Sequence, residues 1–244
     1  MSGIGDRLEG IHAVAAALQA GRLTALTVEQ SRLESEDVAE LVSAARAAGI
    51  EAAVVDDVRP LAATSAPQGV VARAHPLETL TLKELVAKAA QPVIIVLDHA
   101  EDPRNVGAIA RSAVAAGAGG LVVSSRRSAP LGGTAFKAAV GAFELLPVAI
   151  VPSIADAVKQ LRDLGLWTVA LDGAGDDSFY DLRILDDPIA VIVGAEGRGV
   201  SRLVAERADV VARLPMAPGV ESLIASVAAA LALFEIARAR GTLS

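Results

Sequence analysis

The sequence predicts an α/β protein built on a mainly parallel β-sheet, and three observations support this. Short apolar runs of strand length alternate with helical segments over most of the 244 residues. Val93–Leu97 and Ile189–Val193 are apolar throughout, as expected for parallel strands that helices cover on both faces. Ile189–Val193 then runs into the glycine-rich turn Gly194–Gly199, and strand exits of this kind form ligand clefts at the carboxyl edge of such sheets.

Residues 1–76 are predicted to form a small α/β domain. It contains in order a helix, a strand, a helix and two strands, assigned to Leu8–Gln19, Leu23–Val28, Glu36–Ala48, Ile50–Val55 and the end of Ser65–His75. Ser35 is the predicted cap of the second helix, with Glu36 and Asp37 in its first turn. The segment holds no arrangement of a nucleophile beside a base, so a structural or docking role is predicted.

Residues 77–91 are predicted to be a linker with a helix at Thr81–Ala90, and residues 92–244 a second domain. The remaining predicted strands are Val93–Leu97, Leu121–Ser124, Val148–Val151, Trp167–Leu171, Ile189–Val193 and Val210–Leu214. The predicted helices are Val106–Ala116, capped by Asn105 or a neighbour, Ala135–Gly141, Ile154–Leu164, capped by Ser153, Ser201–Arg207 and Ser222–Arg240. This alternation favours parallel pairing of the strands.

Composition excludes several classes of site. The chain has no cysteine, which excludes disulfides, thiolate metal sites and a cysteine nucleophile, and its three histidines lack metal-ligand spacing. No apolar run reaches the roughly 18 residues that span a bilayer, and the first ten residues do not resemble a signal peptide. We therefore expect a cytoplasmic protein with no metal and no membrane association.

The distribution of charge is more informative than the net charge of −7. Residues 98–137 carry five basic and three acidic side chains, whereas residues 1–75 carry six basic and ten acidic ones. Only the first window looks like a surface for phosphate groups, and on charge alone a solvated face fits equally well. Aromatic residues make up only 2% of the chain, which argues against platforms for base stacking.

Three stretches carry candidate chemistry. In DHAEDPRNVGAIAR (residues 98–111), a helix entrance favours anions, and Arg111 lies among apolar residues, which favours a site over a surface charge. GAEGRG (residues 194–199) has neither the glycine spacing of a dinucleotide-binding loop nor the lysine of a Walker A loop. It predicts a turn whose backbone contacts a ligand directly, although this motif taken by itself also fits an ordinary strand-to-helix turn. LPMAPGVESLIAS (residues 214–226) repeats the strand exit followed by a helix.

In this order the three stretches resemble the motifs of the SpoU, or TrmH-like, class of the SPOUT methyltransferases, over about residues 92–240. EGIHAVAAAL, AARAAGIEAAVVD and PQGVVA in residues 1–75 are similar to the substrate-binding domain that often precedes them, which has a ribosomal-protein-like fold. The closest overall resemblance is to enzymes that methylate a guanosine 2′-hydroxyl in large-subunit ribosomal RNA.

The resemblance implies a C-terminal deep trefoil knot, an exception to the usual absence of knots. It further implies S-adenosylmethionine bound in the knot, RNA as substrate, ribosomal rather than transfer RNA, and a homodimer in which two subunits complete each site. The implied catalytic residues are Asn105, Arg111, Glu196 and Ser222, and the implied cofactor-binding residues are Gly194, Leu214, Met216 and Leu223.

Methyl transfer to a hydroxyl needs orientation and loss of the hydroxyl proton. The family role proposed for the matching arginine is to help remove that proton. Arginine is a poor base at neutral pH, so we expect Arg111 to hold a phosphate and stabilise developing negative charge. Glu196 and Asn105 would orient Arg111 or the ribose.

Two departures from the family pattern leave alternatives open. Ile224 stands where the third motif has an asparagine, and Pro67 replaces the histidine of an HQG motif. These departures raise a second hypothesis, a homologue that binds RNA but methylates slowly or not at all. A third is a general nucleotide-binding α/β protein.

Overall fold

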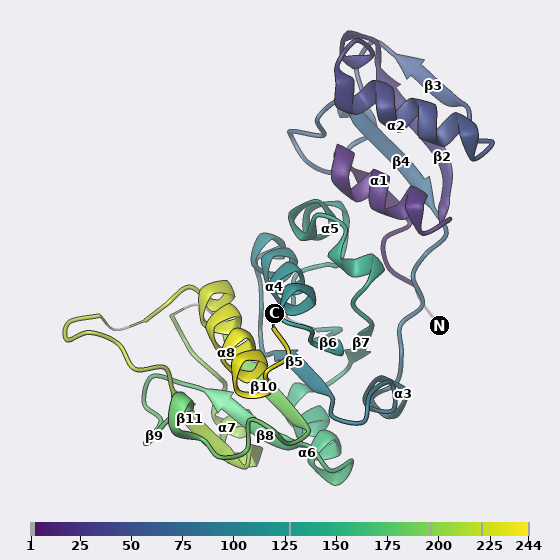
Figure 1. The fold of residues 1–244 in the computed structure, drawn as a ribbon. Helices are drawn as coiled ribbons and strands as arrows, with labels where there is room; N and C mark the ends of the chain where they lie inside the picture. Colours follow the sequence, from purple (N-terminus) through teal and green to yellow (C-terminus); the bar gives the residue numbers. More distant parts are fainter. Residues whose placement is uncertain (1–2, 127, 196, 221, 244) are drawn as a thin grey trace.

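The computed structural model describes residues 3–126, 128–195, 197–220 and 222–243, which form two β-sheets (Figure 1). The larger sheet has the strand order β7-β6-β5-β10-β8-β11-β9, and every adjacent pair is parallel. Its strands are β5 (Val93–Leu97), β6 (Gly120–Ser124), β7 (Val148–Val151), β8 (Trp167–Leu171), β9 (Asp177–Ser178), β10 (Ile189–Val193) and β11 (Val210–Arg213). The predicted parallel sheet is confirmed, and β9 is an addition.

The helices of this part are α3 (Leu82–Val86), α4 (Pro103–Ala115), α5 (Gly133–Ala139), α6 (Ile154–Asp163), α7 (Arg202–Arg207) and α8 (Ala225–Ala239), with the 3-10 turns η3 (Ala142–Glu144) and η4 (Phe179–Asp181). The linker helix and the C-terminal helix are several residues shorter than predicted. The linker helix ends at Val86, and α8 begins at Ala225 because residues 222–224 are not helical. Asp102 caps α4 by accepting a hydrogen bond from Arg104 N at 2.8 Å. Asn105 is therefore inside the first turn and is not the cap.

The smaller sheet has the order β1-β4-β2-β3, with strands β1 (Arg7–Glu9), β2 (Leu23–Glu29), β3 (Ala52–Val55) and β4 (Val70–Ala74). Its helices are α1 (Ile11–Gln19) and α2 (Glu36–Ala47), with the turns η1 (Gln30–Arg32) and η2 (Arg59–Leu61). The prediction of a helix from Leu8 was wrong at its start. Gly10 has φ of 83°, which separates β1 from α1, and β1 pairs with β4.

Of the two predicted serine caps, one makes the expected hydrogen bond and the other does not. Ser153 Oγ accepts a hydrogen bond from Asp156 N at 3.3 Å, which confirms the cap of α6. Ser35 occupies the N-cap position of α2, but its hydroxyl donates to Arg32 O at 2.6 Å and caps nothing.

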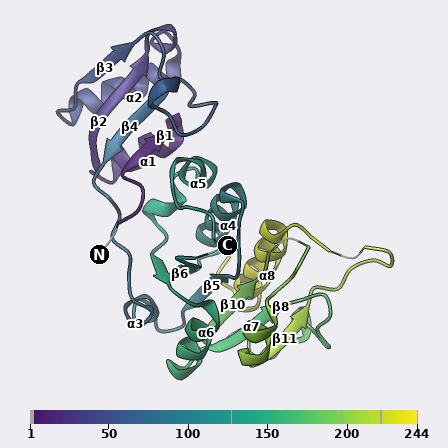
Figure 2. The ribbon, with the colours of Figure 1, turned by 180° about the vertical axis from the view of Figure 1, so that it is seen from behind.

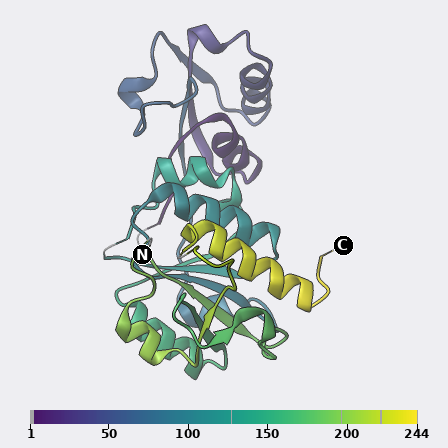
Figure 3. The ribbon, with the colours of Figure 1, turned by 90° about the vertical axis from the view of Figure 1, so that its left-hand side faces the viewer.

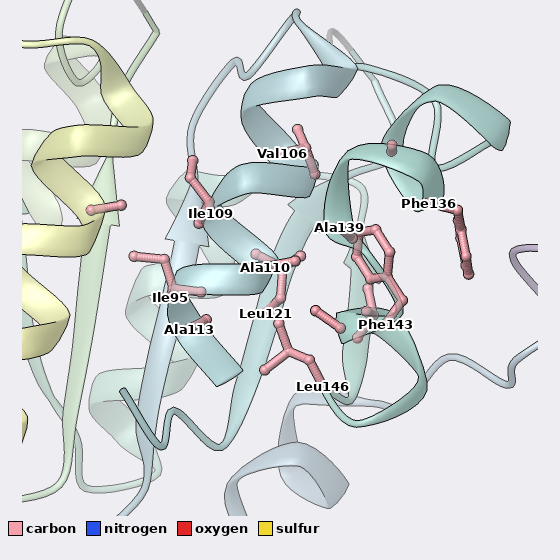
Figure 4. Close-up of a cluster of buried hydrophobic side chains, with 14 of the residues drawn as sticks. Ile95, Val106, Ile109, Ala110, Ala113, Leu121, Phe136, Ala139, Phe143 and Leu146 are labelled. Atoms are coloured by element: carbon pink, nitrogen blue, oxygen red, sulfur yellow. The ribbon is translucent and has the colours of Figure 1, made fainter. Parts of the chain in front are cut away.

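Alternate residues of the central strand β10 enter two separate cores. Ile189, Val191 and Val193 pack with α4, α5 and α8, whereas Ala190 and Ile192 pack with α3, α6 and α7. Figure 3 shows α8, α4 and α5 side by side over one face of the sheet. Figure 4 shows the core between α4, α5 and the sheet, where the rings of Phe136 and Phe143 lie 4.7 Å apart. Both faces of β10 are therefore covered, as its apolar sequence predicts.

The N-terminal part packs on the larger one through α5 and η3. Arg22 forms an ion pair with Glu144 in which Nη2 and Oε1 are 2.5 Å apart, and both side chains are largely buried. Lys137 of α5 donates a hydrogen bond to Ala66 O. Within the described ranges, no helix has the length and apolar character needed to cross a membrane, and no cluster of side chains could hold a metal ion.

Gly107 lets α4 and α5 pack closely, and Gly107→Ala tests this. A Cβ at this position would lie 2.5 Å from Ala135 O and 2.6 Å from Ala138 Cβ, so the two helices must separate. We expect a loss of about 1–3 kcal/mol in the free energy of unfolding, measured by urea denaturation. Gly119→Ala is the control, because Gly119 lies outside both helices and the nearest neighbour of its Cβ, Val93 O, would be 3.7 Å away. Equal stability of the two variants would contradict the packing argument.

Ile224 occupies the N-cap position of α8, where it makes no side-chain capping bond, and it is 57% exposed. An asparagine here can accept a hydrogen bond from the first turn, so Ile224→Asn should stabilise the protein by about 1 kcal/mol. Thermal unfolding measures the effect as a rise in Tm of about 2–4 °C. Ile224→Ala removes the same exposed side chain without adding a cap, and an equal rise in that variant would refute the explanation.

Candidate functional site

Two cavities lie at the carboxyl edge of the larger sheet, on the two sides of the turn that follows β10. The last residue of β10, Val193, pairs with Leu97 of β5 and with Leu171 of β8, so the three strands end at one level. The first cavity has a volume of about 500 Å³ and opens toward β8 and β11; the second, of about 490 Å³, opens toward β5 and α4. Ligands of open α/β sheets bind at such a position.

The first cavity gathers five of the sequence-predicted residues. These are Gly194, Leu214, Met216, Ser222 and Leu223. Leu171 and Val193 extend its apolar wall, and Asp172 provides a carboxylate beside the turn. The cavity thus combines apolar side chains, bare backbone and one acidic group.

The turn between the cavities is tight. Gly199 N donates to Ala195 O at 3.0 Å, and Gly197 and Gly199 have φ of 72° and 65°, values that favour glycine. A Cβ on Gly194 would lie 2.0 Å from the carbonyl carbon and oxygen of Gly199. The backbone at this point therefore leaves no room for a side chain.

The second cavity holds Asn105. It is lined by the loop from His99 to Asp102, by Asn105 and Ile109 of α4, and by residues of the same turn. Ser226 Oγ at the start of α8 donates to Asn105 Oδ1 at 3.2 Å, which joins the third motif to the first. Gly194, Ala195, Arg198 and Gly199 line both cavities, so ligands bound in the two would be neighbours.

A buried carboxylate fixes the rim of the second cavity. Asp98 Oδ1 lies 2.8 Å from His99 Nδ1, and its Oδ2 accepts a hydrogen bond from Ser201 N at 2.8 Å. His99 has φ of 59°, an uncommon backbone conformation for histidine, and its side chain is partly exposed. Asp98 thereby holds the β5 exit and the β10 turn together.

One predicted residue lies away from both cavities, and another lies outside the described residues. Arg111 is exposed and lines a different hollow, together with Gln19, Val140 and Leu145. Glu196 lies outside the described residues. The structure of one chain therefore brings Asn105, Ser222 and the four predicted cofactor residues to one edge of the sheet and leaves Arg111 apart from them.

Sequence reasoning missed Asp172, Arg198 and His99. Asp172 follows the apolar strand β8 directly, so the rule used for the other strand exits could have found it. Arg198 lies within the turn that was singled out, and only its lining of both cavities identifies it. No pattern in the sequence indicated His99.

Two family models match the chain. Residues 92–234 match the SpoU rRNA Methylase family, and residues 7–80 match the model described as RNA 2′-O ribose methyltransferase substrate binding. A 23S rRNA (guanosine-2′-O-)-methyltransferase RlmB from Ralstonia nicotianae is 38% identical over 241 residues, which cover 96% of this chain and 95% of the relative. RlmB from Pseudomonas aeruginosa is 41% identical over 177 residues, 71% of each chain.

Solved structures share the fold over nearly the whole chain. The SpoU methyltransferase AviRb from Streptomyces viridochromogenes, crystallised with AdoMet, is 26% identical with a TM-score of 0.78, covering 97% of this chain and 91% of its own. An AdoMet-bound rRNA methyltransferase from Sinorhizobium meliloti is 25% identical with a TM-score of 0.78, covering 98% of this chain and 88% of its own.

These structures confirm the predicted fold class, a mainly parallel sheet of the SPOUT knot type preceded by a small α/β domain. The sequence matches, the shared fold and the motif residues at the strand exits lead to one assignment. The chain belongs to the SpoU rRNA methylase family of RNA 2′-O-ribose methyltransferases.

Proposed function

We propose that this protein transfers a methyl group from S-adenosylmethionine to the 2′-hydroxyl of a guanosine in 23S ribosomal RNA. The observation that carries the proposal is the pair of cavities on either side of one glycine turn, which can hold a methyl donor and an acceptor side by side. Near full-length similarity to a 23S rRNA guanosine methyltransferase supports the choice of target.

The first cavity suits S-adenosylmethionine. Leu214, Met216 and Leu223 offer an apolar slot for an adenine ring, and the bare backbone at Gly194 offers peptide groups for its polar edge. Asp172 offers oxygen acceptors for ribose hydroxyls. When bound, this cofactor supplies an electrophilic methyl group on its sulfonium sulfur.

The second cavity is the proposed site for the target ribose. Asn105 presents an amide that Ser226 holds in place, and Arg198 provides a positive charge at the junction of the cavities. A fixed amide orients the ribose, and a cation stabilises negative charge that develops on the oxygen as its proton leaves. Orientation and charge stabilisation are therefore the proposed contributions of these side chains.

A homodimer would bring Arg111 to the site of a partner subunit. Helix α8 exposes an apolar stripe, consisting of Val227, Leu231 and Phe234, each 41–44% exposed. The spacing of these residues puts them on one face of the helix, and an exposed apolar stripe of this kind marks an interaction surface. Because α8 packs beside α4, a second copy that covers α8 comes close to the helix that carries Arg111 (Figure 3).

The proposed division of labour assigns RNA binding to residues 1–76, connection to residues 77–91 and catalysis to residues 92–244. Ribosomal RNA is the proposed partner in preference to transfer RNA. A substrate of this kind also implies a cytoplasmic protein.

The function is tested with tritiated S-adenosylmethionine and separately purified 23S rRNA, 16S rRNA and transfer RNA. Label should enter 23S rRNA, and digestion should release it as 2′-O-methylguanosine. Label in transfer RNA alone would contradict the proposed target. RNA binding with no transfer to any of the three would support the alternative of an inactive homologue.

Gly194→Ala should weaken binding of S-adenosylmethionine at least tenfold. Its methyl group has no room beside Gly199, so the turn must move and reshape the first cavity. Calorimetric titration measures the affinity, and circular dichroism checks that the variant is folded. Gly119→Ala is the control, since its nearest neighbour, Val93 O, would be 3.7 Å away. If the affinity of Gly194→Ala for S-adenosylmethionine were unchanged, the assignment of the cofactor to this cavity would be wrong.

Arg111→Ala should retain binding of S-adenosylmethionine and lose methyl transfer by about 10²-fold or more, as expected for a group that stabilises charge in the transition state. Arg111 lies outside the cofactor cavity, so its removal leaves that cavity intact. Calorimetry and the transfer assay measure the two effects separately. Unchanged turnover would refute the assignment.

A mixed dimer tests whether Arg111 acts on the partner subunit. Arg111→Ala and Gly194→Ala chains are refolded together and assayed at an S-adenosylmethionine concentration too low to saturate the Gly194→Ala chain, so that each chain alone has little activity. If the site is shared between subunits, the mixture regains activity, because one of the two sites of the mixed dimer combines an intact Gly194 with an intact Arg111. If Arg111 served its own chain, every site would stay defective and the mixture would remain inactive.

A further inference from the structure

The N-terminal sheet has a third cavity of about 290 Å³ on the face away from α1 and α2. We propose that this cavity binds one nucleotide of the RNA substrate, with its phosphate held between Arg7 and Arg73 and its base next to Glu9. The inference rests on the proposed RNA substrate and specifies where the N-terminal part contacts it.

Strand register places the key side chains on one face of this sheet. Arg7 of β1 is opposite Arg73 of β4, which in turn pairs with Ala25 of β2. Two residues further along, Val71 pairs with both Glu9 and Thr27. Because side chains alternate between faces along a strand, these residues share one face.

The opposite face is buried beneath the helices. Leu8, Ala72 and Leu26 alternate with the residues of the cavity and pack in the core with α1 and α2. Figures 2 and 3 show both helices on one side of the sheet and the segment that contains η2 on the other. Leu61, Ala62 and Ala63 of that segment, with Gly133 at the start of α5, form the wall of the cavity.

The two arginines indicate an anion. Like charges directly opposite each other on neighbouring strands destabilise a sheet. Both Arg7 and Arg73 are exposed, and neither takes part in an ion pair found among the described residues. They stand together although residues 1–75 carry more acidic than basic side chains. A phosphate between them would relieve their repulsion, and the planar guanidinium group binds phosphate with two parallel hydrogen bonds.

Glu9 indicates a hydrogen-bond donor in the same ligand. The residue is only 2% exposed, and its Oε2 accepts hydrogen bonds from Ala63 N at 2.8 Å and Thr64 N at 3.2 Å. Its Oε1 is buried without a partner. A Cβ on Gly133 would lie 3.6 Å from this oxygen, so the bare glycine leaves the carboxylate beside the cavity wall. An unpaired buried acceptor is costly, and an N–H group from a ligand would satisfy it.

A nucleotide has the chemical groups that complement the side chains of this cavity. It offers a phosphate for the arginine pair, N–H donors for Glu9 and a flat apolar surface for Leu61, which is 60% exposed. The carboxylate should favour cytosine, whose exocyclic amino group donates, over uracil, which has a carbonyl oxygen at the same position. Free phosphate would satisfy only the arginines.

The experiment measures binding of the full chain to oligocytidine and oligouridine of equal length over a range of salt concentrations. Arg7→Gln and Arg73→Gln should each weaken binding to both oligonucleotides severalfold. Each should reduce the slope of log K against log salt by about 0.7, the contribution of one phosphate contact on a single strand. Arg46→Gln, an exposed arginine on α2 beyond the opposite face, is the matched control and should change neither quantity. Equal behaviour of all three variants would overturn the phosphate site.

Glu9→Gln tests the base. Its amide oxygen can still accept the hydrogen bonds from Ala63 and Thr64, while its NH₂ group replaces the unpaired acceptor with a donor. Loss of a negative charge strengthens binding to both oligonucleotides, so the readout is their affinity ratio. The wild-type chain should prefer oligocytidine, and the variant should lose or reverse this preference. An unchanged ratio, or competition by inorganic phosphate as effective as by the oligonucleotides, would overturn the nucleotide assignment.

The transfer assay separates this inference from the proposed function. In active enzyme, Arg7→Gln should raise KM for 23S rRNA and leave the affinity for S-adenosylmethionine unchanged. If the wild-type chain transferred no methyl group while oligonucleotide binding showed these dependences, the proposed function would fail and the cavity would stand. Normal transfer with RNA affinity unaffected by either arginine would leave the function and refute the cavity.

Discussion

The turn after β10 is the constraint on which the site depends. Gly194 lies so close to Gly199 that no side chain fits between them, and the backbone of this turn separates two cavities. Strands β5 and β8, on either side of β10, end level with it, so both cavities open at the same edge. Asp98 then holds the turn to the β5 exit through Ser201 N. The sites that we propose for the methyl donor and the acceptor are neighbours because the two cavities share one wall.

Helices α4 and α8 connect the cavities with the surface that we propose for a partner subunit. Their buried faces cover the sheet next to β10, and the hydrogen bond between Ser226 and Asn105 joins their first turns. Their exposed faces carry Arg111 and the apolar stripe of α8. One pair of helices therefore supports the site within the chain and also forms the surface that we propose for the partner subunit.

The N-terminal sheet differs from the larger sheet in how it is covered. Its helices cover one face only, so its strands alternate between buried apolar residues and polar residues such as Arg7, Glu9 and Arg73. The covered face and the ion pair between Arg22 and Glu144 fix this part against α5 and η3. The other face is left to interact, which agrees with the match of residues 7–80 to a substrate-binding model.

The parallel sheet could be predicted from local pattern, because strands buried on both faces must be apolar throughout, as β5 and β10 are. Pattern also predicts that the strand exits at Gly194 and Leu214 lie near the helix start at Asn105, since the carboxyl ends of parallel strands meet at one edge. Strand β1 was not predicted because three residues are too few to show the alternation of apolar and polar side chains that indicates a strand. Only its pairing with β4 identifies it.

The contacts between side chains, by contrast, depend on the three-dimensional packing of the chain. Arg111 and Asn105 are six residues apart on one helix, yet the first lies in an outer hollow and the second in a cavity, because a helix presents its residues in different directions. The pairing of Arg7 with Arg73 and the unpaired oxygen of Glu9 likewise arise from contacts between segments more than 50 residues apart. Local pattern cannot specify such contacts, since they depend on strand register and on the packing of distant elements.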